Sequence, residues 1–149
     1  MPDTECGFQN LPNGNAVLIY RGPTISVSIG FDPNWVAGSA TDPVPAITDV
    51  EALVDTGAAQ SCIDNLLASV LKLPVVDRRE IAGIAGKYKT NIYLAQIAVP
   101  PLRIIQYGTF AGVDLVAGGQ LHQALLGRTF LQDLTMEYDG KSGRVRIST

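Results

Sequence analysis

The most informative stretch of the chain is Ala52-Leu53-Val54-Asp55-Thr56-Gly57-Ala58-Ala59-Gln60-Ser61-Cys62. Its first three residues are an apolar run, which predicts a buried strand. The glycine that follows Asp55 and Thr56 permits a tight turn at the strand's end. The strand would therefore deliver a carboxylate from the sheet interior to a rigid turn. Asp and Gly are also ordinary turn residues, so these three letters alone leave catalysis open.

Two further stretches strengthen the catalytic interpretation of the Asp-Thr-Gly turn. About 26 residues downstream lies a glycine-bearing segment, Ile81-Ala82-Gly83-Ile84-Ala85-Gly86-Lys87-Tyr88. Near the end of the chain comes Ala124-Leu125-Leu126-Gly127-Arg128-Thr129-Phe130-Leu131. In this order, and over about residues 24–133, the three stretches together resemble the retropepsin family, the single-lobe aspartic proteases of retroviral type.

The resemblance implies a role for each residue of the first motif. Asp55 would be the catalytic aspartate, and Thr56 would hydrogen-bond across the axis of a dimer. Gly57 would let its backbone amide approach the carboxylate. Ala58 and Ala59 would face the substrate. The implied activity is the hydrolysis of peptide bonds.

The other two motifs supply the cover and the support of that site. By resemblance, the glycine-rich hairpin is a flap over the substrate, and its tip would consist of Gly83, Ile84, Ala85 and Gly86. Small residues there allow close backbone approach and opening. The segment Leu126, Gly127 and Arg128 would close a loop behind the active site and lead into a short helix.

One position departs from the family's pattern. Retroviral members carry an acid directly after the Asp-Thr-Gly-Ala turn, and that acid pairs with the arginine of the Gly-Arg segment. Here Ala59 stands at that position and Gln60 follows it. Arg128 is therefore expected to find another acid, in its own subunit or in the other one, and Arg128→Ala is expected to weaken dimerisation.

Peptide hydrolysis by an aspartate pair would require a second copy of the chain. Peptide hydrolysis by carboxylates needs one group to activate a water and another to protonate the amide carbonyl. A second Asp-Thr/Ser-Gly turn is absent from the sequence, since Asp114 and Asp133 are each followed by leucine. A symmetric homodimer would bring the two copies of Asp55 together on the two-fold axis. The partners predicted are therefore the chain itself and an extended peptide or protein substrate.

The expected fold is all-β, a closed retropepsin-like acid-protease barrel lobe with one or two short helices. Residues 1–15 are expected to be a mobile lead-in, and 16–149 a single domain. Alternating or continuous apolar runs predict strands, helical spacing predicts a helix at 63–72, and the resemblance implies the short helix at 128–132. The strands are expected at 16–20, 24–31, 47–54, 75–81, 89–99, 102–107 and 113–117 with a C-terminal hairpin at 134–147; the helices at 63–72 and 128–132; and a loop at 32–45.

Composition excludes several other classes of protein. The 149 residues carry a net charge of −3 and no basic run, which argues against nucleic acid as a partner. No apolar stretch approaches the ~20 residues of a membrane span. The first residues hold no basic or apolar signal region, so a cytoplasmic protein is expected, and export of a chain whose signal has been removed stays open. One histidine and scattered acids show no metal-ligand spacing, and neither a metal nor another cofactor is expected.

Rival interpretations remain for several features. Cys62 and His122 could form a nucleophile and base, although a buried structural cysteine and a hydrogen-bonded histidine explain them as well. The glycine-rich segment fails as a phosphate loop because Tyr88 stands where Ser or Thr is required; it could also be a plain hairpin turn. Trp35 could touch a partner or pack on the barrel edge. For the whole chain, the alternatives are a catalytically lapsed dimerisation or peptide-binding module and a fragment of a polyprotein.

Overall fold

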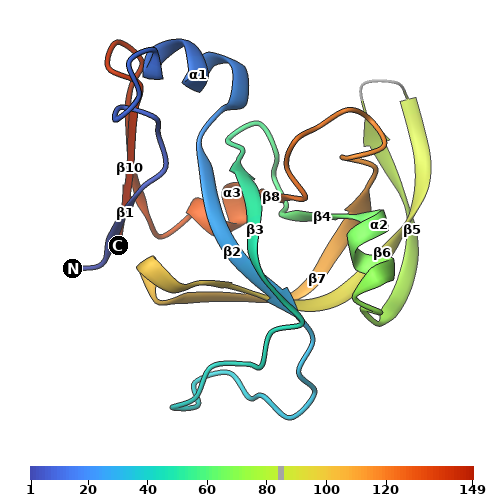
Figure 1. The fold of residues 1–149 in the computed structure, drawn as a ribbon. Coiled ribbons are helices and arrows are strands. Elements are labelled where there is room, and N and C mark those ends of the chain that lie inside the picture. Colours follow the sequence, from blue (N-terminus) through green and yellow to red (C-terminus); the bar gives the residue numbers. More distant parts are fainter. Residues whose placement is uncertain (84–85) are drawn as a thin grey trace.

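A computed structural model describes residues 1–83 and 86–149 (Figure 1). Within them, two sheets and three α-helices form around one core. The strands are β1 (Asp3–Glu5), β2 (Thr24–Gly30), β3 (Ile47–Val54), β4 (Cys62–Asp64), β5 (Val75–Gly83), β6 (Gly86–Val99), β7 (Ile104–Val113), β8 (Ala124–Leu126), β9 (Thr135–Asp139) and β10 (Arg144–Ser148). The helices are α1 (Gly14–Arg21), α2 (Asn65–Val70) and α3 (Arg128–Leu131), with a 3-10 turn at Pro100–Leu102.

The larger sheet closes into a barrel. Its strand order is β2-β3-β8-β4-β7-β6-β5, and an additional β2–β6 pairing joins the ends of the first six strands. In the part of the chain that the structure describes, β5 is paired only with β6, and their hairpin projects from the barrel (Figure 1). The alternation expected in the second strand is present, since Ile25, Val27 and Ile29 are buried. The predicted all-β barrel is therefore confirmed.

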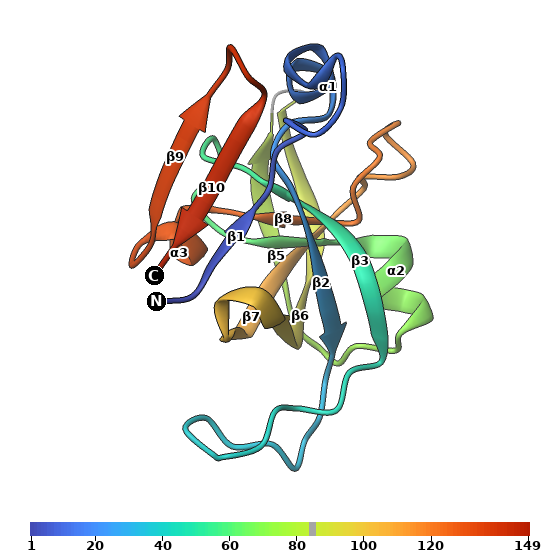
Figure 2. The same ribbon diagram turned by 60° about the vertical axis from the view of Figure 1, so that its left-hand side comes forward.

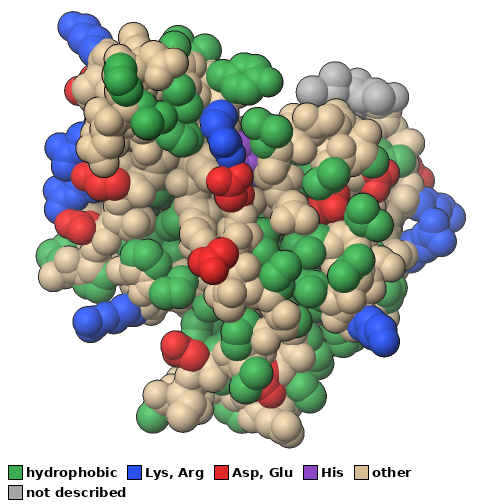
Figure 3. Space-filling model, viewed as in Figure 1, with side chains coloured by type: hydrophobic (Ala, Val, Ile, Leu, Met, Phe, Trp, Pro, Cys, Tyr) green, Lys and Arg blue, Asp and Glu red, His purple; other side chains and the backbone are tan. Residues whose placement is uncertain are grey.

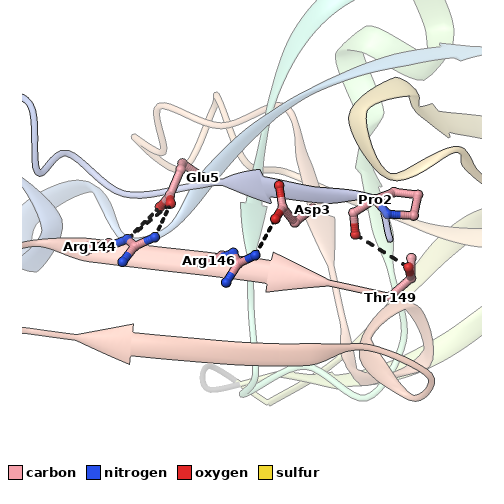
Figure 4. Close-up of polar contacts among 6 residues, drawn as sticks. All are labelled: Pro2, Asp3, Glu5, Arg144, Arg146 and Thr149. Atoms are coloured by element: carbon pink, nitrogen blue, oxygen red, sulfur yellow. Dashed lines mark hydrogen bonds and ion pairs between the residues drawn. The ribbon is translucent and has the colours of Figure 1, made fainter.

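The smaller sheet joins the two ends of the chain in the order β1-β10-β9 (Figure 2). The sequence predicts a mobile lead-in over residues 1–15, but β1 lies antiparallel to β10 and Cys6 is only 1% exposed. Ion pairs join Glu5 to Arg144 and Asp3 to Arg146 across the two strands (Figure 4). The partners of this segment lie about 140 residues away, so no local pattern could reveal them.

The first expected strand, at 16–20, is wrong: this segment is the middle of α1. Five apolar residues alone do not distinguish a strand from a short helix. Gly14 and Leu18 are buried, four residues apart, which is helical spacing. The helix stops at Gly22, which has a φ of 72° and is followed by Pro23. The hairpin expected between this segment and the second strand consequently does not form; β2 pairs with β3 instead.

Two boundaries in the middle of the chain also differ from expectation. The helix predicted at 63–72 begins only at Asn65, because the preceding residues form the short strand β4 between β8 and β7. Strands predicted at 102–107 and 113–117 are replaced by the single strand β7, after which the chain turns. The buried carboxylate of Asp64 organises both changes. It accepts hydrogen bonds from the backbone N–H groups of Leu67, Leu115 and Val116.

The loop predicted at 32–45 is confirmed, and Trp35 packs on the barrel. Its indole ring meets the ring of Tyr107 edge to face, with centroids 5.3 Å apart. Its Nε1 donates to the carbonyl of Thr41 at 2.9 Å. The loop is therefore anchored through its tryptophan to β7. None of the helices in the described part of the chain is long and apolar enough to cross a membrane.

Candidate active site

Asp55 stands at the end of a strand that is held on both sides. β3 pairs antiparallel with β2 and parallel with β8, so that Val54 lies opposite Leu126. The backbone N–H of Val54 donates to the carbonyl of Pro23 at 2.9 Å, and that of Asp55 donates to the carbonyl of Leu126, also at 2.9 Å. The half-buried side chain of Asp55 is therefore attached to a stretch of backbone that is held rigidly on both sides.

The turn after Asp55 fixes its carboxylate. Gly57 donates its N–H to Asp55 Oδ1 at 2.8 Å, and Ala58 donates its N–H to the Asp55 carbonyl. A Cβ at Gly57 would lie 3.1 Å from the same Oδ1, tighter than ordinary contact. Glycine at this position thus lets the amide reach the acid. Thr56 is exposed.

The Gly-Arg segment supports this turn from behind. The N–H groups of Arg128 and Thr129 donate to the carbonyls of Ala58 and Ala59 at 2.8 and 3.0 Å, and Arg128 Nη1 donates to the carbonyl of Thr56 at 2.8 Å. A Cβ at Gly127 would lie 2.6 Å from one backbone oxygen of the turn and 2.8 Å from another. The two segments are therefore packed backbone to backbone.

A partly buried network of polar side chains also supports this turn, and the sequence motifs do not indicate it. Ser61 is 2% exposed; its hydroxyl accepts from the N–H of Gly127 at 3.0 Å and donates to Gln106 Oε1 at 2.9 Å. The Gln106 amide then donates to Thr129 Oγ1 at 3.2 Å. These groups come from the turn, from β7 and from α3, so their meeting depends on tertiary structure.

A cleft of about 740 Å³ opens between the turn and the β5–β6 hairpin. Its floor includes Gly57, Ala58 and Ala59, the residues that directly follow the Asp-Thr pair. Most of the other side chains are small or apolar. The described residues that line the cleft also include Gln60, Cys62, Arg79, Glu80, Ile81, Ala82, Tyr88, Ile92, Thr109, Ala111 and Val113. The space suits an extended chain with apolar side groups.

The hairpin brings the expected glycines together. Gly83 and Gly86 pair at the ends of β5 and β6. Ile84 and Ala85, the other two residues predicted at the tip, lie outside the described residues. Charged side chains lie along the hairpin, where Arg79 pairs with Asp77 at 2.7 Å and Lys87 lies 3.9 Å from Glu80.

Comparison with solved structures identifies the architecture. A retropepsin-like aspartic protease from Rickettsia conorii aligns with a TM-score of 0.54 at 16% identity, covering 97% of this chain and 89% of that one. The chain has a retropepsin-like fold. The EIAV protease complexed with the inhibitor HBY-793 aligns with a TM-score of 0.46 at 23% identity, covering 74% of this chain and 86% of that one. No family model and no curated protein sequence matches the chain.

Within this retropepsin-like fold, Cys62 and His122 do not form a catalytic pair. Cys62 lines the cleft, and burial raises the pKa of its thiol to about 11, which leaves it protonated at neutral pH. His122 lines a different cavity, where its Nε2 lies 2.8 Å from Thr24 Oγ1. Among the described residues, no group of three or more His, Cys, Asp or Glu is placed to hold a metal ion.

Sequence motifs locate the floor of the retropepsin-like cleft better than its walls. The wall residues Thr109, Ala111 and Val113 alternate on β7, which is the signal that could have found them. The sequence pattern does not reveal this alternation, because it predicts two separate strands where β7 runs as one.

Proposed function

We propose that this protein is an aspartic endopeptidase whose catalytic pair forms across a homodimer. The observation that carries the proposal is the position of Asp55. Its carboxylate rises from a strand paired on both edges, is held by the N–H of Gly57, and stands beside a cleft of about 740 Å³. A fixed carboxylate beside a space for an extended chain is the arrangement that hydrolysis of a peptide requires.

One carboxylate per chain makes the second subunit part of the site. In the dimer, the two copies of Asp55 share one proton, because two carboxylates about 3 Å apart do not both ionise. The ionised member takes a proton from the attacking water, and the protonated member gives one to the carbonyl oxygen of the substrate.

The other residues have supporting roles in this mechanism. Thr56, which is exposed in the single chain, would hydrogen-bond across the two-fold axis. Gly57 positions the carboxylate, and Ala58 and Ala59 line the floor against which the peptide backbone lies. The β5–β6 hairpin acts as the flap, and the substrate adds an extended strand between flap and floor.

The solved structure from Rickettsia conorii carries the name of an aspartic protease, and the shared fold supports the same reaction type here. The rival function is a peptide-binding or dimerisation module that keeps this architecture without activity. Both functions need the braced turn and the cleft. Cleavage is what separates them.

The deciding experiment is cleavage of an unbiased peptide mixture, measured by mass spectrometry at pH values between about 3 and 8, which span the titration expected of such a pair. Wild type is compared with Asp55→Asn and with the matched control Asp133→Asn, an exposed acid outside the cleft lining. The proposal expects cleavage by wild type and by the control, and loss of cleavage in Asp55→Asn. Cleavage that survives Asp55→Asn contradicts the mechanism. A wild-type dimer that cleaves nothing favours the binding module.

A further inference from the structure

The outer face of α1 is apolar although it is exposed. The inner face of this helix buries Gly14 and Leu18. The opposite face carries Asn15, Ala16, Ile19 and Tyr20, none of them charged, and the last two are each 82% exposed. A helix that is apolar on both sides is normally covered on both sides. Large exposed apolar side chains that neighbour one another on a helix are suited to contact with another molecule.

The exposed side chain of Leu121 lies near the end of α1. Tyr20 and Leu121 line the same small cavity of about 170 Å³, and Leu121 is 53% exposed. Arg21, which is ion-paired with Glu51, also lines this shared cavity. In the space-filling view, hydrophobic side chains gather over α1, and a basic side chain with an acidic one below it lies beside them at the hollow (Figure 3). We call this surface, formed by Ile19, Tyr20 and Leu121, the α1 patch.

The α1 patch is fixed beside the end of β3 that carries Asp55. β2 begins directly after α1 and runs antiparallel to β3, so Thr24 lies opposite Leu53. Pro23, which joins α1 to β2, accepts the N–H of Val54 at 2.9 Å. The end of α1 and the turn that carries Asp55 therefore lie at the same end of the barrel (Figure 1).

The central strand of the terminal sheet, β10, has no free edge with which a second copy could pair. β10 is paired on one edge with β1 and on the other with β9, all within one chain. The ion pairs Asp3–Arg146 and Glu5–Arg144 also hold β1 against β10 (Figure 4). A second copy would have to displace β1 before it could pair with β10. Among the described strands of this sheet, a second copy would find only the outer edges of β1 and β9 free, and the outer face of α1 is a separate exposed surface.

We propose that the α1 patch is part of the surface through which two copies of this chain dimerise. This inference rests on the proposed function, because a catalytic pair of Asp55 carboxylates places the two-fold axis within a few ångströms of that residue. An exposed element fixed beside Asp55 at this end of the barrel then faces the second copy. α1 is such an element, and dimerisation would cover its outer face in both subunits at once.

The test compares two pairs of charge insertions on exposed helices. Ile19→Glu/Tyr20→Glu alters the α1 patch. The control Leu66→Glu/Val70→Glu alters α2, where the native side chains are 65% and 69% exposed; α2 lies across the barrel from α1 in both ribbon views (Figures 1 and 2). Sedimentation measures the dimer dissociation constant. We expect it to rise at least about ten-fold for the α1 variant and to stay unchanged for the control.

Three results would overturn the inference, and only one of them also overturns the proposed function. Equal dissociation constants for wild type and a folded α1 variant overturn the role of α1 alone, since Asp55-dependent cleavage by the dimer would stand. A wild-type protein that stays monomeric up to high concentration overturns both. Amide hydrogen exchange of wild type gives an independent readout that needs no variant. Residues 14–21 should gain protection as concentration rises through the dissociation constant, and unchanged exchange contradicts the proposal.

Discussion

The guanidinium of Arg128 donates to the backbone carbonyl of Thr56 at 2.8 Å, and so reaches across to the turn that holds Asp55. By resemblance to the retroviral enzymes, an acid at position 59 should receive this arginine, yet Ala59 stands there. Among residues 1–83 and 86–149, no carboxylate lies within ion-pair distance of Arg128. A backbone oxygen takes the place of the missing acid, so the turn keeps its support without a charged partner.

Removal of this contact should loosen the turn that would place Asp55 in the proposed dimer. Arg128→Ala leaves the backbone bonds of the segment intact and deletes one charge-assisted hydrogen bond, worth about 1 kcal/mol at an exposed position. We expect the dimer dissociation constant, measured by sedimentation, to rise roughly five-fold. The control is Arg78→Ala, another exposed arginine, on β5. A dissociation constant equal to that of wild type would show that the contact does not serve dimerisation.

Gly127 should tolerate no side chain. A Cβ there would meet the backbone oxygens of Gln60 and Ala58 at 2.6 and 2.8 Å, and neither oxygen belongs to a flexible side chain. Gly127→Ala should lower the free energy of unfolding by about 2–4 kcal/mol, in the range of overpacking and backbone strain. Gly140→Ala is the matched control, because its Cβ would meet only a tyrosine ring at an ordinary 3.5 Å. Urea denaturation of both variants measures the difference, and equal stability would contradict the close packing.

The parts of the fold that sequence predicts well are those in which one short segment carries its own signal. β3 begins and ends at the predicted residues, since an apolar run meets an acid and a glycine at Asp55 and Gly57. β2 and the C-terminal hairpin show regular alternation, and α3 follows the glycine at Gly127. In each case the local pattern and the tertiary environment ask for the same structure.

The parts that sequence misses depend on distant partners. β4 has three residues, too few to show a period, and exists because β7 and β8 flank it. β1 depends on β10, and the hydroxyl of Ser61 finds Gln106 only after the barrel has closed. For α1, a five-residue apolar run was compatible with either element, and its helical form follows from burial of Gly14 and Leu18. In each of these cases, contacts with residues distant in the sequence decide the structure, and the local sequence preference is weak.

Asp64 should be among the most sensitive acids of the chain. Its carboxylate is 2% exposed and accepts three backbone N–H groups, at 3.2 Å from Leu67, 2.9 Å from Leu115 and 3.2 Å from Val116. Asp64→Ala would leave all three donors without this acceptor in the interior. We expect a loss of about 3 kcal/mol or more in the free energy of unfolding, from unsatisfied buried groups.

The control for this prediction is Asp133→Ala, which removes an exposed acid and should change the stability by less than about 0.5 kcal/mol. Chemical denaturation of both variants gives the comparison. If Asp64→Ala is as stable as the control, the three hydrogen bonds do not hold α2 and the turn that follows β7 in place.

His122 should make the stability of the fold depend on pH. The hydroxyl of Thr24 donates to the carbonyl of Gly22 at 3.0 Å, so its oxygen must accept from the Nε2–H of His122 at 2.8 Å. The neutral ring then carries a bare Nδ1, which is buried and has no hydrogen-bond partner in the described residues. Burial, and next the positive charge of Arg21, lower the pKa of His122 below its ordinary 6.5.

Because the folded protein resists protonation of His122, the unfolded chain binds more protons as pH falls below 6.5. The free energy of unfolding should therefore decrease from pH 6.5 downward and level off below the folded pKa. The carboxyl of Asp3, whose pKa the Arg146 hydrogen bond lowers from 3.8, titrates outside this window. In urea denaturation between pH 8 and pH 5, His122→Gln should start from lower stability than wild type but lose less of it on acidification. An equal decrease in both proteins would assign the pH dependence to other groups.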